Sequence, residues 1–405
     1  RKDGLREVQE GSPFLMRRAS LVVVAAGRGE RAGGETAKQY RSLCGRMLWE
    51  WSALLGERLF RRALVDETVL VVPPGDENLF RDRIRHFRSP FLIAAGGKER
   101  GDSVLAGVRA ASGDVVLVHD GARPFAGVSL CERILKAVDG EKGIVPLLPV
   151  SDALKREELG GRFQPVSREG LFATQTPQGF PRKLLEEAIL SAGSSMKDEG
   201  EAWAKTGREL GAVEGDRRNM KITWPGDFDL AESQFRMISR TGIGYDIHAL
   251  VPGRRFILGG VAVPSFPLGF KGHSDGDPLT HALSDAILGA AGLGDIGTIY
   301  PASDMRYRNI SSLLILEDAA KRAEGAGWSL EWADMVAIVQ EPRLAGYLGA
   351  MKEALEGVLP GNWKGRLHLK VKSGEGEGTV GSCGAVICHA AATMSIPSWM
   401  LEEER

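Results

Sequence analysis

Three side chains in the second half of the chain have the types and spacing of a metal site. Asp246 and His248 alternate along a strand-like GYDIH stretch, so their side chains point the same way. His281 lies one turn into a helix that should begin at Asp277 and Pro278, because a carboxylate at the N-cap followed by proline is a typical helix start. Zinc accepts two imidazoles and a carboxylate, and three ligands leave a fourth position open for a substrate oxygen. This spacing predicts a catalytic zinc site.

A glycine-rich turn follows the first apolar strand of the chain, at 20–26. Gly27 and Gly29 form the turn, and Arg31 and Lys38 come next. Glycine lets backbone N–H groups approach a phosphate closely, and the two cations add fixed positive charge. Taken alone, the turn is either a phosphate-binding loop or an α/β turn that needs glycine for its geometry.

The elements that position these groups in the first half alternate between strand and helix patterns. The expected strands are 20–26, 67–72, 90–94, 115–119 and 143–149, and the expected helices include 100–111, 129–138 and a closing helix at 227–234. This alternation predicts an α/β fold, with a mostly parallel, Rossmann-like sheet and helices on both faces. Ligands bind at the strand ends of such sheets. The groups that cluster there include Gly96, Gly97, Ser103, Asp120, Arg123, Arg168, Thr176 and Lys221.

Length and composition restrict the possible classes of protein. A chain of 405 residues is too long for one ordinary core and predicts two domains, preceded by a mobile tail at 1–18. The 52 basic and 53 acidic residues nearly cancel, so nucleic acids and membranes are not expected partners. The four cysteines have no paired spacing, which favours a reducing cytoplasm. No apolar run approaches the ~18–20 residues that span a bilayer.

The motifs GYDIH, ILGG and GHSDGDPLTHALSDAILGAAGLGDIG occur in this order. Through them, the segment 241–394 resembles 2-C-methyl-D-erythritol 2,4-cyclodiphosphate synthase of the non-mevalonate isoprenoid pathway. The resemblance implies an α+β domain at 241–405. It would cyclise 4-diphosphocytidyl-2-C-methyl-D-erythritol 2-phosphate and release CMP, with zinc on the three ligands and magnesium with the diphosphate. His273 is the implied catalytic group. The implied substrate-binding residues are Ser274, Asp277, Asp295, Ile296, Gly297, Asp304, Arg343, Lys372, Glu375 and Glu377.

A second set of motifs, AAGxGxR…KQY, GGxxRxxSV, VHDGARP, TPQ and NxKIT, occupies the first half. Here 21–235 resembles 2-C-methyl-D-erythritol 4-phosphate cytidylyltransferase, which implies a domain at 19–236 that transfers CMP from CTP to methylerythritol phosphate, with magnesium on the triphosphate. Arg31 and Lys38 would stabilise the transition state, and Arg168 and Lys221 would position the attacking phosphate. The implied substrate-binding residues are Gly27, Gly29, Gly96, Gly97, Ser103, Asp120, Arg123 and Thr176.

Together the halves resemble a natural fusion of the two families, and the resemblance implies a homo-oligomer, because the cyclases are trimers and the transferases dimers. Three departures stand out. Arg218 and Ala302 replace family aspartates, and 372–377 is glycine-rich where the family has threonines. Either Glu375 or Glu377 fits the family's metal-binding glutamate. An alternative follows: an active transferase joined to a zinc-bound, weakly active oligomerisation scaffold. A generic sugar-nucleotide transferase fused to a zinc hydrolase explains fewer motifs.

Overall fold

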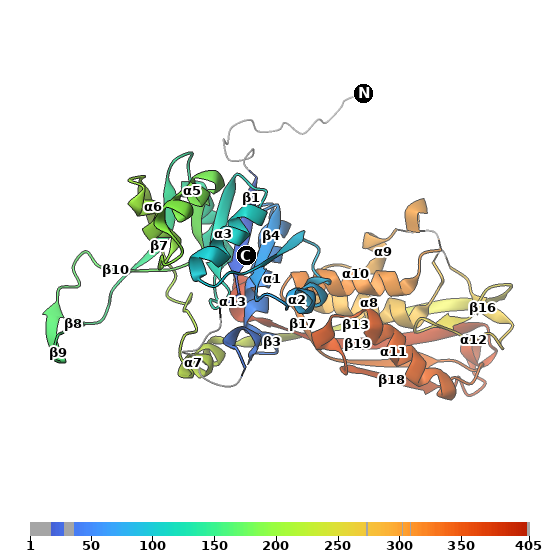
Figure 1. Cartoon of the computed structure of the whole chain (residues 1–405). Helices are drawn as coiled ribbons and strands as arrows, with labels where there is room; N and C mark the ends of the chain where they lie inside the picture. The colour runs from blue at the N-terminus through green and yellow to red at the C-terminus, as the bar shows by residue number, and fades with distance from the viewer. Residues whose placement is uncertain (1–17, 28–35, 273, 302, 308, 403–405) are drawn as a thin grey trace, which may run out of the picture. The chain divides into compact units, whose positions relative to one another are not determined.

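The structure is a computed structural model that describes residues 18–27, 36–272, 274–301, 303–307 and 309–402. The chain divides into two compact units, each with its own sheet (Figure 1). The first contains Arg1–Ile84 and Ser89–Ala231, and the second contains Arg85–Arg88 and Glu232–Arg405. None of the described helices is long and apolar enough to cross a membrane.

A mixed, mostly parallel sheet forms the centre of the first unit. Its strands are β1 (Ala19–Val24), β4 (Glu67–Val72), β5 (Phe91–Ala95), β6 (Val115–Asp120), β7 (Gly143–Pro149), β10 (Phe172–Thr174), β11 (Gln178–Pro181) and β12 (Leu210–Glu214). The order is β10-β7-β11-β6-β1-β4-β5, with β12 beside β7. Strands β6, β1, β4 and β5 pair in parallel, whereas β10 and β11 are antiparallel to their neighbours. The predicted α/β fold and its mostly parallel sheet are confirmed.

Helices cover both faces of this sheet. They are α1 (Leu48–Arg61), α2 (Glu77–Ile84), α3 (Arg100–Ala110), α4 (Val128–Ala137), α5 (Arg182–Ala192) and α6 (Glu199–Lys205), and a further helix, α7 (Gly226–Gln234), includes the boundary between the two units. A Cβ on Gly56 of α1 would lie 2.2 Å from Thr68 Oγ1, and one on Gly107 of α3 would lie 2.7 Å from a methyl carbon of Val71. Thr68 and Val71 point to opposite faces of β4, because they are an odd number of residues apart. The two glycines therefore let helices pack closely on opposite sides.

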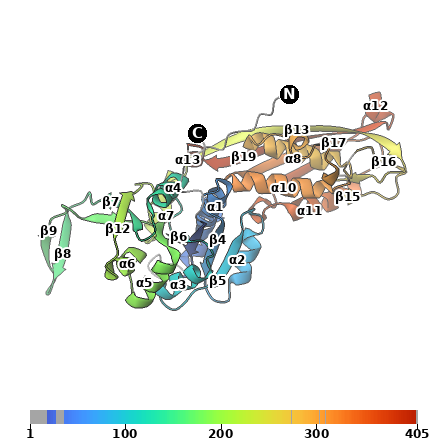
Figure 2. The ribbon, with the colours of Figure 1, turned by 90° about the horizontal axis from the view of Figure 1, so that it is seen from above.

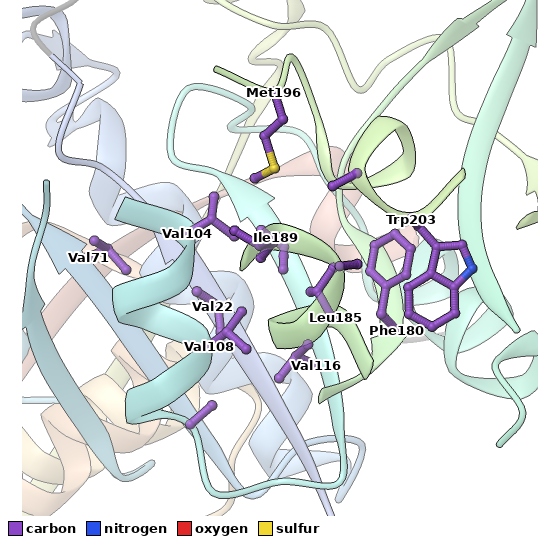
Figure 3. Packing of buried hydrophobic residues seen from close by; sticks show 14 of the residues in the cluster. Val22, Val71, Val104, Val108, Val116, Phe180, Leu185, Ile189, Met196 and Trp203 are labelled. Carbon is purple, nitrogen blue, oxygen red and sulfur yellow. The ribbon is translucent and has the colours of Figure 1, made fainter. Parts of the chain in front are cut away.

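The core on the α3 side joins this helix and α5 to the strands (Figure 3). Its members include Val22, Val71 and Val116 from the strands, Val104 and Val108 from α3, and Leu185 and Ile189 from α5. The rings of Phe180 and Trp203 lie 5.1 Å apart beside them. Full burial of each such side chain contributes about 1.5–3 kcal/mol to folding. This core fixes the end of β6, where Asp120 lies.

Smaller elements complete the first unit. The strands β2 (Ser42–Leu43) and β3 (Arg46–Met47) form one hairpin, and β8 (Leu154–Glu158) and β9 (Arg162–Val166) form another. The β8–β9 hairpin extends away from the eight-stranded sheet in both views (Figures 1 and 2). Its turn residue Leu159 is fully exposed, and Phe163 is 65% exposed. The 3-10 helix η3 covers Lys38–Tyr40.

The second unit is built on a five-stranded sheet in the order β16-β13-β19-β17-β18. Its strands are β13 (Met237–Pro252), β16 (Leu268–Phe270), β17 (Ser329–Ile338), β18 (Leu367–Lys372) and β19 (Ala385–Pro397), and β14 (Ile257–Leu258) pairs separately with β15 (Val261–Ala262). The helices are α8 (Pro278–Ala291), α9 (Ile296–Ile299), α10 (Ser312–Gly325), α11 (Leu348–Val358), α12 (Gly378–Gly381) and α13 (Ser398–Glu402), with 3-10 turns η4 (Met305–Tyr307), η5 (Ala345–Tyr347) and η6 (Gly361–Trp363).

Helix α8 packs directly on β13 and β19, and two glycines make this contact possible. A Cβ on Gly244 would lie 1.7 Å from the carbonyl oxygen of Ala282, and one on Gly242 would lie 2.1 Å from that of Ala286. On the opposite face of β13, Ile243, Tyr245 and Ile247 are 77%, 52% and 46% exposed. Strand alternation thus gives β13 one face against α8 and one exposed apolar face.

Candidate active sites

The predicted metal ligands meet between β13 and α8. Asp246 and His248 share the face of β13 that Gly244 presents to α8, and His281 lies in the first turn of α8. Asp246 Oδ2 lies 3.0 Å from His248 Nε2 and 2.9 Å from His281 Nδ1. One ligand atom from each residue lies within 4.8 Å of the other two, and this is the only such group among the residues that the structure describes. The three side chains therefore form a potential divalent metal site.

Helix α8 begins where the sequence predicts. Asp277 is its N-cap, accepting hydrogen bonds from the backbone N of Leu279 and of Thr280, each at 3.1 Å. The same carboxylate accepts from Thr280 Oγ1 at 2.7 Å and from Gly260 N at 2.7 Å, and it is fully buried. These bonds fix the first turn that carries His281. A substrate contact by Asp277, predicted from the sequence, would require this buried carboxylate to leave them.

Asp246 supplies a negative charge at the potential metal site. Burial alone would raise the pKa of Asp246, but hydrogen bonds from His248 and His281 lower it to about 2. Burial alone would lower the pKa of His248, yet the hydrogen bond and charge of Asp246 raise it. Asp246 is therefore ionised at neutral pH. The outward-facing nitrogen of His248, Nδ1, lies 2.9 Å from the carbonyl oxygen of Lys271, so Nε2 is the atom available to a metal.

The predicted hydroxyl-binding residues follow α8. Asp295 is exposed and caps α9, accepting from Thr298 N at 2.8 Å. The N–H of Ile296 donates to Asp285 Oδ1 at 2.8 Å, and Gly297 is exposed. Asp285 is half-buried, and its carboxylate holds the start of α9.

The glycine-rich loop at 372–377 is exposed and bonded internally. Ser373 Oγ donates to the Glu375 carboxylate, Gly376 N donates to Gln340 Oε1 at 3.2 Å, and Glu377 N donates to Gly374 O at 2.8 Å.

The remaining predicted substrate-binding residues of this unit differ in burial. Ser274 is nearly buried, Lys372 and Arg343 are exposed, and Asp304 is paired with Arg306 at 2.6 Å. His273 and Ala302 lie outside the described residues.

In the first unit, cations gather around one carboxylate. Asp120, at the end of β6, lies 2.7 Å from Lys221 Nζ, 3.2 Å from Arg100 Nη2 and 3.9 Å from Arg123 Nε. Burial alone would raise the pKa of Asp120, but these positive charges hold it well below its usual range. Arg100 also pairs with the fully buried Glu199 at 2.6 Å. Asp120 thus fixes three cationic side chains at the strand end.

Two further segments join this cluster. Lys38 Nζ donates to the carbonyl oxygen of Ile222 at 3.0 Å, so the KQY segment and the NxKIT motif are in contact. The backbone N of Asp120 donates to Thr176 Oγ1 at 3.0 Å, and that hydroxyl also contacts His119 Nδ1 at 3.1 Å. Burial lowers the pKa of His119 to about 4 and keeps it neutral.

The glycine pair before α3 forms a tight turn. A Cβ on Gly96 would lie 2.3 Å from Ala26 Cβ, and one on Gly97 would lie 2.3 Å from Asp102 Cβ. Ser103 Oγ accepts from Gly97 N at 3.1 Å. These close approaches explain why the turn needs glycine, and they place its backbone beside the end of β1.

Some predicted residues are not joined to the cluster by any described contact. Arg168, just after β9, donates to the carbonyl oxygen of Ser151 on the exposed segment that includes the β8–β9 hairpin. Gly27 is exposed, whereas Gly29 and Arg31 lie outside the described residues. Arg218 pairs with Asp216 at 3.5 Å.

Comparison with known proteins follows the two-unit division. The family model of 2-C-methyl-D-erythritol 4-phosphate cytidylyltransferase (IspD) matches residues 19–237, and the model of the YgbB family matches 239–395. The bifunctional enzyme IspD/IspF of Anaeromyxobacter dehalogenans is 38% identical over 388 residues, covering 92% of this chain and 96% of that one. The chain belongs to the bifunctional IspD/IspF family. The expected cytidylyltransferase and cyclodiphosphate synthase domains of isoprenoid biosynthesis are thereby confirmed.

Two further relatives of the IspD/IspF family match most of the chain. The bifunctional enzyme IspD/IspF of Rhizorhabdus wittichii is 34% identical and covers 94% of this chain and 98% of that one. The solved structure of the bifunctional IspDF from Campylobacter jejuni is 28% identical, has a TM-score of 0.45, and covers 94% of this chain and 99% of that one.

In both units, the sequence did not reveal a residue that bonds to a predicted site residue from a distant part of the chain. Glu199 lies 99 positions after its partner Arg100, and Ser312 lies 31 positions after His281. Arg100 stood within a predicted ligand-binding stretch, so its charge was a usable signal. Glu199 and Ser312 had no local signal, because an ordinary helix start contains the same residue types.

Proposed function

We propose that the first unit transfers CMP from CTP to 2-C-methyl-D-erythritol 4-phosphate and releases pyrophosphate. The observation that supports this most strongly is the set of cations around Asp120. Lys221 and Arg100 are held by carboxylates before substrate arrives, and Lys38 is anchored next to Lys221. Charge develops on phosphoryl oxygens during the transfer, and pre-placed cations stabilise it without further reorganisation.

Magnesium enters this proposal with the nucleotide. Asp120 is already paired with cations, and Asp216 is paired with Arg218, so neither carboxylate is an open metal ligand in the described structure. We infer that magnesium is carried by the triphosphate of CTP, whose oxygens it neutralises. Arg31 and Arg168 complete the predicted set, the first stabilising the transition state and the second positioning the attacking phosphate.

For the second unit, we propose the cyclisation of 4-diphosphocytidyl-2-C-methyl-D-erythritol 2-phosphate with release of CMP. Asp246, His248 and His281 would hold zinc, which fits their donor types and their mutual distances. Zinc, when bound, supplies a positive charge that polarises a phosphate oxygen. The chain itself would orient the tethered nucleophile, with Asp295, Ile296 and Gly297 at the erythritol hydroxyls and His273 and Ser274 at the phosphates, while magnesium accompanies the diphosphate.

Separate assays test the two activities in the full chain. Lys38→Ala should abolish most CTP-dependent pyrophosphate release, and His281→Ala should abolish zinc binding and CMP release. Lys136→Ala, an exposed lysine paired with Glu132 on α4, is the matched control for lost positive charge. Wild-type protein should carry about one zinc per chain. Full zinc retention by His281→Ala would rule out the proposed site.

A second candidate function is supported by the glycine-rich loop. The N–H groups of Gly376 and Glu377 are bonded within the protein, so as described they do not point at an anion. This favours the alternative in which the second unit binds zinc and assembles but turns over slowly. Wild-type protein that binds zinc and yet releases no CMP from the diphosphocytidyl substrate would support this alternative over an active cyclase.

We also propose a homo-oligomer that acts in the cytoplasm. Ile243, Tyr245 and Ile247 on β13 and Trp332 on β17, which is 48% exposed, give the five-stranded sheet an apolar face that a second copy would cover. None of the four cysteines, all of which the structure describes, forms a disulfide, which fits a reducing compartment. Tyr245→Glu should dissociate the assembly in sedimentation analysis, and an unchanged mass would refute this interface.

We place the domains at 19–236 and 241–405. The compact units and the family matches both change over close to this junction, and β13 begins at Met237 within it.

A further inference from the structure

His281 is held on both sides of its ring. Its Nδ1 faces Asp246 Oδ2 at 2.9 Å, on the side of the metal site. Its Nε2 faces away from that site, 2.9 Å from Ser312 Oγ and 3.3 Å from Ser274 Oγ. His281 is mostly buried and Ser312 is fully buried, so the Nε2 side depends on these hydroxyls.

Ser312 is in turn held by Asp275. The backbone N of Ser312 donates to Asp275 Oδ2 at 3.0 Å, and its hydroxyl bonds to Asp275 Oδ1. A carboxylate only accepts hydrogen bonds, so the Ser312 hydroxyl must donate to it. The hydroxyl proton is then used, and the Ser312 oxygen can face Nε2 of His281 only as an acceptor. Nε2 therefore carries a proton, and Nδ1, which faces the Asp246 carboxylate at 2.9 Å, is the nitrogen that a metal would bind in place of that hydrogen bond.

The contacts of Ser274 also fit a hydrogen bond that runs outward from His281 Nε2–H. Its oxygen already accepts from Gly276 N at 3.0 Å and lies 3.3 Å from His281 Nε2, farther than Ser312. It serves as a weaker, shared acceptor of the same N–H. An unprotonated Nε2 would instead place its lone pair 2.9 Å from the Ser312 oxygen with no proton between them, which is repulsive.

We propose that Ser312 and Asp275 are positioning residues that fix His281 as an Nδ1 metal ligand, through a chain from the Asp275 carboxylate to the Ser312 hydroxyl to His281 Nε2–H. The proposal rests on the zinc site proposed above. His248 has the mirror arrangement, because its Nδ1 faces the Lys271 carbonyl and leaves Nε2 for the metal. The two histidines thus present different nitrogens, each set by an acceptor on its far side.

Zinc affinity of the full chain tests the role of Ser312. Competition with a chromophoric chelator should show that Ser312→Ala raises the zinc Kd by about 10–100-fold, the usual effect of losing an outer partner of a metal ligand. Asp275→Asn should give a smaller increase, because an amide oxygen can still accept from Ser312. The matched control is Ser311→Ala, the neighbouring serine, whose side chain makes no cap hydrogen bond at the start of α10.

The protonation state of the ring gives a readout that general loosening of the fold would not produce. In ¹⁵N NMR spectra of the zinc-loaded wild-type chain, His281 should carry its proton on Nε2 and His248 on Nδ1. A proton on Nδ1 of His281 in the zinc-loaded chain would overturn the proposed role of Ser312 and Asp275. A zinc Kd of Ser312→Ala equal to that of Ser311→Ala would do the same. If the wild-type chain and His281→Ala both fail to bind zinc, the metal site itself is refuted, and with it the positioning role of Ser312 and Asp275.

Discussion

Gly244 offers the sharpest test of how the fold positions the metal ligands. A Cβ at this position would lie 1.7 Å from the carbonyl oxygen of Ala282, although real Cβ contacts almost always exceed 3.0 Å. Gly244→Ala must therefore separate β13 from α8 by more than about 1 Å at this point. Asp246 follows on β13 and His281 lies next to Ala282 on α8. Their distance of 2.9 Å would lengthen by a similar amount.

This displacement is large compared with the lengths of zinc–ligand bonds. Zinc bonds to nitrogen and oxygen are about 2.0–2.2 Å long, so ligands that separate by an ångström can no longer share one ion well. Misplacement on this scale costs on the order of 10²-fold in turnover. We expect Gly244→Ala to bind zinc weakly and to lose CMP release by about that factor. Pyrophosphate release by the first unit should be unchanged.

Gly289→Ala is the matched control, because it adds the same methyl group to α8 itself. The nearest atom to a Cβ at Gly289 is Gly242 Cα at 4.0 Å, an ordinary contact. Alanine is favoured over glycine in a helix by roughly 0.5–1 kcal/mol, so this variant should retain zinc and activity. The two units need not unfold together, so zinc affinity and the two activities are better measures than one unfolding curve. Wild-type zinc affinity in Gly244→Ala would refute the reasoning.

Three other predictions concern charge and loop geometry. Lys38→Ala should lower pyrophosphate release by on the order of 10²–10³ while zinc content stays normal, and a near-normal rate would contradict its role. In the metal-free chain, Asp246 should titrate by NMR near pH 2, below the ordinary value of 3.8. Its stabilising contribution is then complete above the ordinary value and is lost as pH falls through 2; titration at 3.8 or above would count against the contacts. Gly376→Val should remove most CMP release, because valine is strained at a φ of +79°, whereas an active variant would show that loop shape is unimportant.

Local patterns made the elements and the metal ligands predictable. Continuous apolar runs fix buried strands, and the strands at 67–72 and 143–149 have the predicted bounds. Alternation along β13 placed Asp246 and His248 on one face, and the Asp277–Pro278 cap set the phase of α8 and therefore the direction of His281. Each of these inferences used residues only a few positions apart, where chain geometry alone determines direction.

The long-range partners were not predictable, because tertiary packing rather than local geometry brings them together. Glu199 reaches Arg100 only once α6 packs near α3, and Ser312 reaches His281 only once α10 packs against α8. The same limit applies to Asp277, which the resemblance places among the substrate-binding residues. Its position in the fold gives the carboxylate four internal hydrogen bonds and full burial.

Both sites use an ionised carboxylate to organise groups before substrate binds. Burial alone would raise the pKa of Asp120 and of Asp246, and in each case polar partners lower it instead. Asp120 holds Lys221 and Arg100 in place, so under the proposed transfer the incoming phosphates would meet cations that are already oriented. Asp246 holds the imidazoles of His248 and His281 in the same way at the potential metal site. In both units the fold has already supplied the free energy of ordering these side chains, and that preorganisation is what lowers a barrier during phosphoryl transfer.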